Sequence, residues 1–337
     1  MVIRTVCRAQ RVRRTLPALA AQLGRWTAIM TRMIPCLLLC LALAASTVDW
    51  LGARPGPPTQ ERSLSVANRR GMRLVVANNA DPELRLLLPN SSVADTSVRI
   101  LFPEHVTALR RGDTTAAQLF VFRAGTRGDR PAWRVIGSAL EYERLLRPGL
   151  RVRARATLED DGVRFSYACA NQSNDGYEFV TAVTDPRLTG FLLDLRLERT
   201  FVHHADGFDL LAAETPRRVS IPLDEWLPVR YLASYRWPVP PRHTQRRPDG
   251  VTYIYKSRPV DEPFIATRST DGAWVVASFA RDAGNVWSNP ALTCQHVHQQ
   301  AELGVGQLAV LEFKMLVVRA SLDSALSLAR EQRRLLQ

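Results

Sequence analysis

The stretch LRVRARATLEDDGVRFSYAC (residues 150–169) decides the predicted fold of this chain. Arginine alternates with valine and alanine across 150–158, and larger apolar residues alternate with small or polar ones across 163–169. Alternation with a period of two puts one kind of side chain on each face of a β-strand. Glu-Asp-Asp-Gly at 159–162 offers a turn, with Gly162 available for a positive φ angle. The stretch therefore predicts a β-hairpin with one apolar face and one face in water.

The same alternation recurs through most of the chain beyond residue 63. Leu311, Phe313 and Met315 alternate with Glu312 and Lys314 in a long late strand. Only one helix is predicted, where Ser321 can cap a run whose apolar residues recur at helical spacing. Many strands without intervening helices predict an all-β fold, a large antiparallel β-sandwich (supersandwich) with a short C-terminal helix.

The first 46 residues have the pattern of an export signal. Arg32 precedes an apolar run over 34–45 that ends in small residues, as in secretory signal peptides. Residues 1–29 are unusual for such a signal, so Met30 or Met33 is an alternative start. We expect a secreted or periplasmic protein of the cell envelope, with no stable membrane insertion after cleavage. The expected parts are a signal peptide (1–46), a Pro- and Gly-rich linker (47–63), the sandwich (64–320) and the helix (321–337).

The net charge of +13 suggests nucleic-acid binding at first sight. Seven of the 45 basic residues lie within 1–46, where there is no acidic residue. The rest of the chain therefore has 38 basic and 32 acidic residues, a net charge of +6. Only Lys256 and Lys314 are lysines. A modest charge and an export signal argue against a nucleic-acid partner.

Two cysteines, Cys169 and Cys294, remain after the signal. In an exported protein they could form one disulfide, or they could be two separate buried thiols. Their spacing does not decide between these, because it does not give the separation of the two Cα atoms.

The hairpin runs directly into Asn-Gln-Ser-Asn-Asp at 171–175. A hairpin followed by Asn-x-Ser-x-Asp resembles the central strands of galactose-mutarotase-like β-supersandwiches. WSNPALTCQH at 287–296 is similar to a stretch of uncharacterised exported bacterial proteins of that kind. The resemblance extends over residues 70–320 and implies a fold used by aldose epimerases and by parts of polysaccharide lyases and glycoside hydrolases. The His and Glu motifs of aldose epimerases have no match here, so the resemblance assigns no catalytic residue.

Residues 226–255 contain six aromatic side chains, 20% of the segment against 7% of the chain. Flat rings can stack on sugar rings and arginines can bind hydroxyls or carboxylates, whereas the alternative is that these rings fill the core. On a strand, Tyr231, Tyr235 and Trp237 would share one face, and so would Tyr253 and Tyr255. The candidate ligand-binding residues are Tyr231, Tyr235, Trp237, Tyr253, Tyr255, Arg230, Arg258, Trp287 and Asn289.

Two groups of histidines are candidates for chemistry. His203 or His204 could form a general acid–base pair with Asp206. His296 and His298 would point to the same side of a strand, as two ligands of a divalent metal must. Either pair could instead be loop histidines bonded to backbone or water. These patterns require no cofactor, and they leave undecided whether the protein binds a divalent metal.

Together these patterns predict an exported protein that binds or acts on a carbohydrate ligand through a concave face lined by aromatic and His side chains. One alternative is a carbohydrate-active enzyme, an epimerase, lyase or hydrolase, on the same scaffold. Another is a structural interaction module of the envelope without catalysis. The common motifs of nucleotide binding, serine hydrolysis and zinc proteolysis do not occur. The sequence does not decide the oligomeric state.

Overall fold

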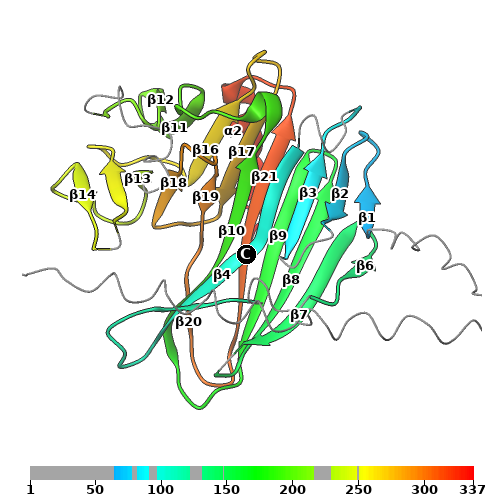
Figure 1. The fold of residues 1–337 in the computed structure, drawn as a ribbon, viewed down its shortest axis with the longest axis vertical. Helices are drawn as coiled ribbons and strands as arrows, with labels where there is room; N and C mark the ends of the chain where they lie inside the picture. The colour runs from blue at the N-terminus through cyan, green and yellow to red at the C-terminus, as the bar shows by residue number, and fades with distance from the viewer. Residues whose placement is uncertain are drawn as a thin grey trace, which may run out of the picture. The chain divides into compact units, whose positions relative to one another are not determined.

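The predicted hairpin lies near the middle of a nine-stranded sheet (Figure 1). Its strands β8 (Leu150–Glu159) and β9 (Gly162–Asn171) pair antiparallel along their whole length. Alternate residues of β8, such as Val152 and Ala154, are fully buried. Gly162 has a φ of +152°, and a Cβ there would overlap the carbonyl oxygen of Met315 in the neighbouring strand, so this turn requires glycine. The hairpin is confirmed.

The computed structural model describes residues 64–77, 82–90, 97–121, 131–146, 148–215, 229–248 and 250–337. The predicted signal peptide and linker lie outside these residues, and so does Trp226. The described residues fall within one unit, residues 61–337. None of the helices in them has the length and apolar content that crossing a bilayer requires.

Three sheets make up the described part of the chain. The nine-stranded sheet has the order β12-β11-β16-β17-β21-β9-β8-β7-β6. Its other strands are β6 (Arg134–Ile136), β7 (Ala139–Leu146), β11 (Thr200–His204), β12 (Gly207–Leu210), β16 (Phe264–Arg268), β17 (Val275–Ala280) and β21 (Leu308–Val318). The seven-stranded sheet has the order β1-β2-β3-β4-β10-β20, with β5 paired to β4. Its strands are β1 (Ser65–Ala67), β2 (Arg73–Val76), β3 (Glu83–Leu87), β4 (Ser97–Arg110), β5 (Ala117–Leu119), β10 (Tyr177–Leu188) and β20 (Ala301–Leu303).

The third, five-stranded sheet has the order β14-β15-β13-β18-β19. Its strands are β13 (Val229–Ser234), β14 (Thr244–Arg246), β15 (Thr252–Tyr255), β18 (Asn285–Ser288) and β19 (His296–Val297). β13 and β15 pair in parallel, unlike the antiparallel pairs found elsewhere in the described residues. A bridge between Arg187 and Cys294 links β10 to the segment that enters β19. The all-β fold with mainly antiparallel sheets is confirmed.

The core lies between the nine-stranded and seven-stranded sheets. Phe102 of the seven-stranded sheet contacts Tyr142, Phe165 and Tyr167 of the other, with ring centroids 4.9–6.2 Å apart. The buried Tyr142 hydroxyl donates to the carbonyl of Phe102 across this layer. Burial of these rings removes a large apolar area from water and holds the two sheets together.

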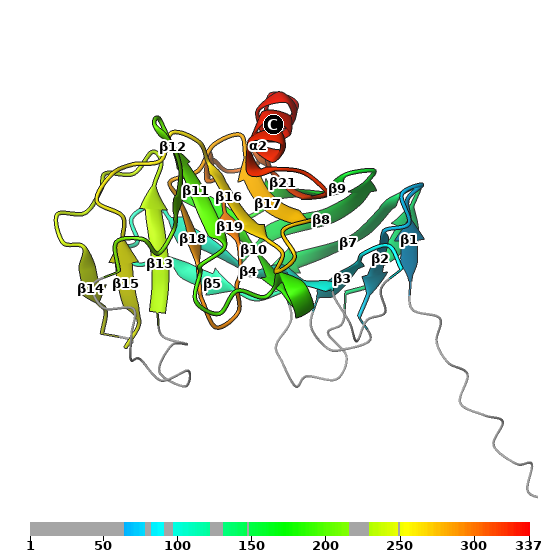
Figure 2. The same cartoon turned by 90° about the horizontal axis from the view of Figure 1, so that it is seen from above.

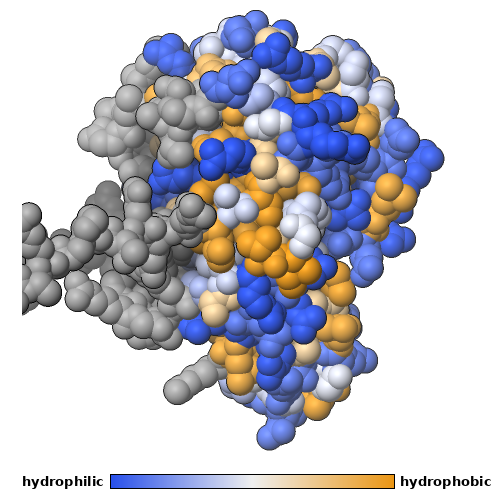
Figure 3. Space-filling view, turned by 90° about the vertical axis from the view of Figure 1, so that its right-hand side faces the viewer, coloured by the Kyte–Doolittle hydropathy of each residue, from blue (hydrophilic) through white to orange (hydrophobic). Residues whose placement is uncertain are grey.

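The predicted C-terminal helix is α2 (Leu322–Arg333). The Ser321 side chain accepts the N–H of Ser324 at 3.1 Å and caps the helix as expected. Its apolar side packs on the face of the nine-stranded sheet that is turned away from β4 and β10 (Figure 2). Figure 3 shows a face with apolar surface bordered by hydrophilic side chains. Val135 and Ile136 on β6 and Leu145 on β7 are exposed apolar residues.

Both lysines are buried inside charged clusters. Lys314 Nζ lies 2.5 Å from a Glu159 carboxylate oxygen and 2.6 Å from one of Asp161, and only 1% of its side chain is exposed. Lys256 Nζ lies 2.6 Å from Asp209 and 3.4 Å from Glu214, with the same exposure. Each ammonium therefore has two carboxylates to compensate for its burial.

Cys169 and Cys294, for which the sequence left a disulfide and two separate thiols open, are not bonded to each other. Cys169 and Cys294 are both free and buried, so the alternative of two separate thiols is correct. Cys169 lies on β9, whereas Cys294 bridges to Arg187 of the seven-stranded sheet. Burial raises the pKa of Cys169 to about 12, which keeps its thiol protonated and unreactive.

Candidate functional site

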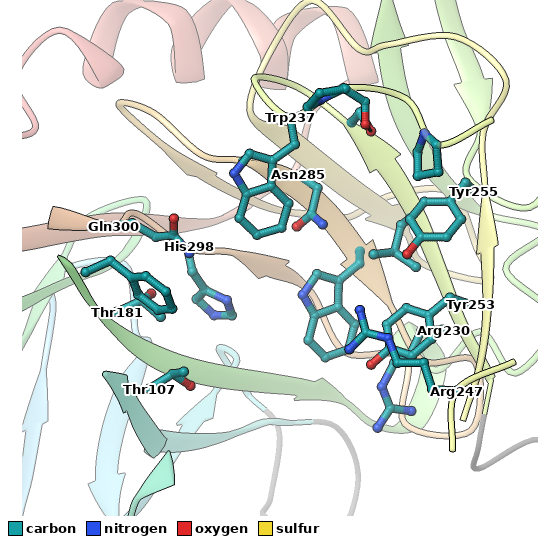
Figure 4. A pocket seen from close by; sticks show the side chains of 17 residues that line it. Thr107, Thr181, Arg230, Trp237, Arg247, Tyr253, Tyr255, Asn285, His298 and Gln300 are labelled. Carbon is teal, nitrogen blue, oxygen red and sulfur yellow. Dashed lines mark hydrogen bonds between the residues drawn. The ribbon is translucent and has the colours of Figure 1, made fainter. Parts of the chain in front are cut away.

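A pocket of about 440 Å³ lies between the five-stranded sheet and strands β4 and β10 (Figure 4). β13, β15 and β18 supply one side, and the loops after β13 and β19 complete the rim. Its lining includes the side chains of Thr107, Thr181, Arg230, Ser234, Trp237, Arg247, Tyr253, Tyr255, Asn285, Trp287, His298 and Gln300. Five of the predicted ligand-binding residues are therefore together in one cavity: Arg230, Trp237, Tyr253, Tyr255 and Trp287.

Aromatic rings and guanidinium groups alternate around this pocket. Tyr253 and Tyr255 share one face of β15, as the sequence predicts, with stacked rings whose centroids are 6.4 Å apart. The Arg247 guanidinium lies 3.9 Å from the centre of the Tyr253 ring, and that of Arg230 lies 5.4 Å from the Trp287 ring. The lining contains no Asp or Glu among the described residues, so its fixed charge is positive.

Trp237 reaches the pocket because a loop is folded onto Gly284. The carbonyl of Gly284 accepts the backbone N–H groups of Tyr235, Arg236 and Trp237, each at 3.0 Å. A Cβ on Gly284 would overlap the Trp237 indole, so the glycine lets the ring lie directly on the backbone. The indole is 48% exposed and its free surface faces the cavity.

Four predicted ligand-binding residues lie elsewhere. Tyr231 is part of the core, and Tyr235 packs against the core. Because β13 ends at Ser234, Tyr235 and Trp237 lie beyond the strand and do not share a face with Tyr231. Asn289 is buried in a turn, where its side chain accepts the N–H of Ala291 at 3.0 Å. Arg258 pairs with Asp206 at 2.7 Å on the surface.

The proposed acid–base residues lie on the β11–β12 hairpin, and none of them lines the pocket. His203 Nδ1 is 2.7 Å from Asp261, and the buried His204 Nδ1 donates to the carbonyl of Pro259 at 2.7 Å. Burial lowers the pKa of His204 and keeps it neutral. These contacts are those of structural histidines. Arg258 donates hydrogen bonds to both carboxylate oxygens of Asp206.

A buried polar cluster lies directly behind Trp287. The His296 ring stacks on the Trp287 indole with centroids 3.5 Å apart, and its Nε2 is 3.3 Å from Asp185 Oδ1. Burial alone would raise the pKa of Asp185, but interaction with His296 and Arg187 reverses this and lowers it to about 2. Asp185 is therefore an ion at every working pH.

His296 and His298 do lie on one side, as predicted, with ring centroids 5.1 Å apart. His298 Nε2 donates to the carbonyl of Thr184 at 2.9 Å. Burial and the nearby charge of His296 lower the pKa of His298 to about 3, so this histidine stays neutral. The group whose ligand atoms converge is instead His296 with Asp185 and Cys294. His203 and His204 contribute nothing to it.

Glu104 and His105 interact electrostatically with Asp185 and His296 of this cluster, and sequence reasoning missed both of them along with Asp185. Glu104 has a 36% exposed side chain with Arg187 at 3.8 Å. Burial, followed by the Asp185 charge, raises its pKa. The pKa of His105 is lowered, mainly by burial and to a smaller extent by His296. The available signal was the pair of charged stretches, Glu-His at 104–105 and Asp-Pro-Arg at 185–187, each within a strand that also carries other polar residues.

Neither a family model nor a curated protein matches this chain. Among solved structures it is similar to a galactose-mutarotase-related enzyme from Lactobacillus acidophilus, with a TM-score of 0.45 and 11% identity over 77% of this chain and 98% of that one. A putative aldose 1-epimerase from Escherichia coli K12 gives a TM-score of 0.42 and 11% identity over 77% and 99%. An alpha-N-acetylgalactosaminidase from Bifidobacterium bifidum gives a TM-score of 0.46 and 10% identity, over 80% of this chain and 38% of that one. The structures it resembles thus include galactose-mutarotase-like proteins, as the sequence predicts. This likeness concerns the arrangement of the strands.

Proposed function

We propose that the pocket binds a saccharide, and that it does so outside the cytoplasm because residues 1–46 have the pattern of an export signal. The observation that carries this proposal is the set of rings Trp237, Tyr253, Tyr255 and Trp287 around one cavity of about 440 Å³. That volume is in the range of small-ligand sites. The C–H face of a sugar ring is apolar and flat enough to stack on such rings.

The polar lining supports a ligand rich in hydroxyl groups. Ser234, Asn285 and Gln300 offer donors and acceptors at the cavity wall. A purely apolar ligand would leave these groups desolvated and unpaired, at a cost of about 1–3 kcal/mol each. A polyol can satisfy them while its carbon skeleton contacts the rings.

The charge of the lining favours an acidic saccharide. Arg230 and Arg247 line the cavity without a lining carboxylate among the described residues. A guanidinium binds a carboxylate through two parallel hydrogen bonds, which a neutral hydroxyl cannot match. Uronate-containing oligosaccharides should therefore bind more tightly than neutral ones of equal length, and added salt should reduce this preference.

The test is a glycan array with neutral and uronate-containing saccharides, followed by calorimetry of the strongest ligand. Trp237→Ala should weaken that binding about tenfold, since losing one stacking ring costs about 1.4 kcal/mol. Phe120→Ala is the matched control, because Phe120 is 54% exposed and lies outside the pocket. Saccharide binding that survives Trp237→Ala unchanged, or an array without a single ligand, would overturn the proposal.

A second candidate is turnover of the bound saccharide by an epimerase, lyase or hydrolase reaction. Glu104 favours it, as a partly exposed carboxyl of raised pKa beside His105 and close to Arg230 of the pocket. A carboxyl poised in this way can give or take a proton. Product formation that is lost in Glu104→Gln while saccharide affinity is kept would identify this function.

A further inference from the structure

Asp185, Cys294 and His296 converge from three separate segments. Asp185 belongs to β10, Cys294 lies in the turn between β18 and β19, and His296 begins β19. One carboxylate oxygen, the sulfur and one imidazole nitrogen lie within 4.8 Å of one another, and all three residues are buried. No other set of three such side chains converges in this way among the described residues.

The spacing of two of these atoms is that of metal ligands. Asp185 Oδ1 and His296 Nε2 are 3.3 Å apart. Two ligands at about 2.0 Å from a tetrahedral zinc ion are about 3.3 Å from each other. The same separation is long for a hydrogen bond between a nitrogen donor and an oxygen, whose usual length is about 2.9 Å.

Asp185 Oδ1 supplies an independent observation. Within the part of the chain that the structure describes, this oxygen has no hydrogen-bond partner, although the residue is only 2% exposed. Buried polar atoms almost always have a partner, and a carboxylate oxygen without one is costly. The oxygen points at His296 Nε2, 3.3 Å away, and a cation between these two atoms would bind both of them.

The surroundings hold the three side chains in place. Arg187 Nε donates to the other Asp185 oxygen at 2.5 Å, which leaves Oδ1 to face the cluster. Cys294 Sγ accepts the backbone N–H of Asn289 at 3.3 Å, which fixes the position of the sulfur. The His296 ring is fixed against the Trp287 indole. Outer contacts of this kind orient metal ligands and raise affinity.

We propose that Asp185, Cys294 and His296 form a binding site for a zinc-like transition metal. Sulfur, imidazole nitrogen and carboxylate oxygen together suit Zn²⁺ or Co²⁺, whereas Mg²⁺ and Ca²⁺ prefer oxygen alone. Binding forms a metal–sulfur bond and releases the thiol proton of Cys294 to solvent. Three protein ligands leave a fourth coordination position open. The site does not depend on the proposed saccharide binding.

The metal would tie β10 to β19 directly behind the Trp287 wall of the pocket. Binding to the folded state alone stabilises a protein in proportion to the logarithm of metal concentration over its dissociation constant. Without the metal, the buried Asp185 carboxylate lies beside the His296 ring and the Cys294 thiol.

The test is titration of the metal-free protein with Co²⁺, followed by optical spectroscopy and metal analysis. One Co²⁺ per chain is expected, with a thiolate-to-cobalt charge-transfer band in the near ultraviolet and the intense visible bands of a four-coordinate ion. Zn²⁺ should displace the Co²⁺ and abolish both features.

Three variants assign the ligands. Cys294→Ser should abolish the charge-transfer band, and Asp185→Asn should weaken Co²⁺ affinity at least tenfold. Cys169→Ser is the matched control, since Cys169 is the other buried free thiol and lies outside the cluster, so its band should persist. The unaltered protein decides the question even where a variant fails to fold. Absence of a cobalt–thiolate band in the unaltered protein, or a band lost in Cys169→Ser and kept in Cys294→Ser, would overturn the site.

Discussion

Trp287→Ala should weaken saccharide binding about 30-fold and lower the free energy of unfolding by about 3 kcal/mol. Trp287 forms a wall of the pocket, carries the Arg230 guanidinium 5.4 Å from its ring, and stacks on His296. Aromatic residues in this position are binding hot spots worth about 2 kcal/mol, and each 1.4 kcal/mol is a factor of ten in affinity. Truncation of this half-buried ring also removes its stacking on His296 and leaves a cavity there.

Calorimetry and urea unfolding of the same preparations separate these two effects. Trp274→Ala is the matched control, because Trp274 also carries an arginine over its ring, Arg319 at 4.8 Å, but lies outside the pocket. That variant should lose stability and keep saccharide affinity. Trp287→Phe should recover most of the affinity, since a ring remains. Equal losses of affinity in Trp287→Ala and Trp274→Ala would show that the effect is general destabilisation.

Lys314→Met should lower the free energy of unfolding by about 3 kcal/mol at neutral pH. The buried ammonium lies between Glu159 and Asp161, and its removal leaves two neighbouring carboxylates without their cation. Breaking a buried pair by removing one partner costs about 3–5 kcal/mol, and the partial exposure of these carboxylates puts this cluster at the lower end. Urea unfolding at pH 7 measures the loss.

The loss should shrink in acid. Burial alone would raise the pKa of Asp161, but hydrogen bonds from Lys314 and Gln332 and the Lys314 charge outweigh it, so the pKa lies below its ordinary 3.8. A carboxyl whose pKa is lower in the folded state stabilises the fold above its ordinary pKa and loses that contribution as the pH falls through the lowered value. The difference between Lys314→Met and the unaltered protein should therefore fall below pH 4. A difference that stays constant from pH 7 to pH 3 would exclude this cluster as its cause.

Local patterns explain which elements could be predicted. The hairpin at 150–169 is encoded by alternation over neighbouring residues and by a turn that needs Gly162. The helix α2 is likewise encoded by its cap at Ser321 and by its apolar spacing. Both patterns act within about ten residues, which is the range that a reading of strand and helix periodicity covers.

Contacts between distant segments explain what was missed. The turn of the chain after Ser234 depends on the carbonyl of Gly284, so the expected common face of Tyr231 and Trp237 could not be excluded from the sequence. The approach of Asp185 to His296 depends on how β10 meets β19. Tyr253 and Tyr255 were placed correctly because two alternate residues of one strand share a face wherever that strand lies.

The burial of both lysines has a practical consequence for chemical labelling. Lys256 and Lys314 are the only lysines of the chain, and each ammonium is enclosed with two carboxylates. An amine-directed reagent applied to the folded protein therefore reacts slowly with both side-chain amines. The two side-chain amines become reactive only when their clusters open, so the label found on Lys256 and Lys314 measures the fraction of molecules in which each cluster has opened.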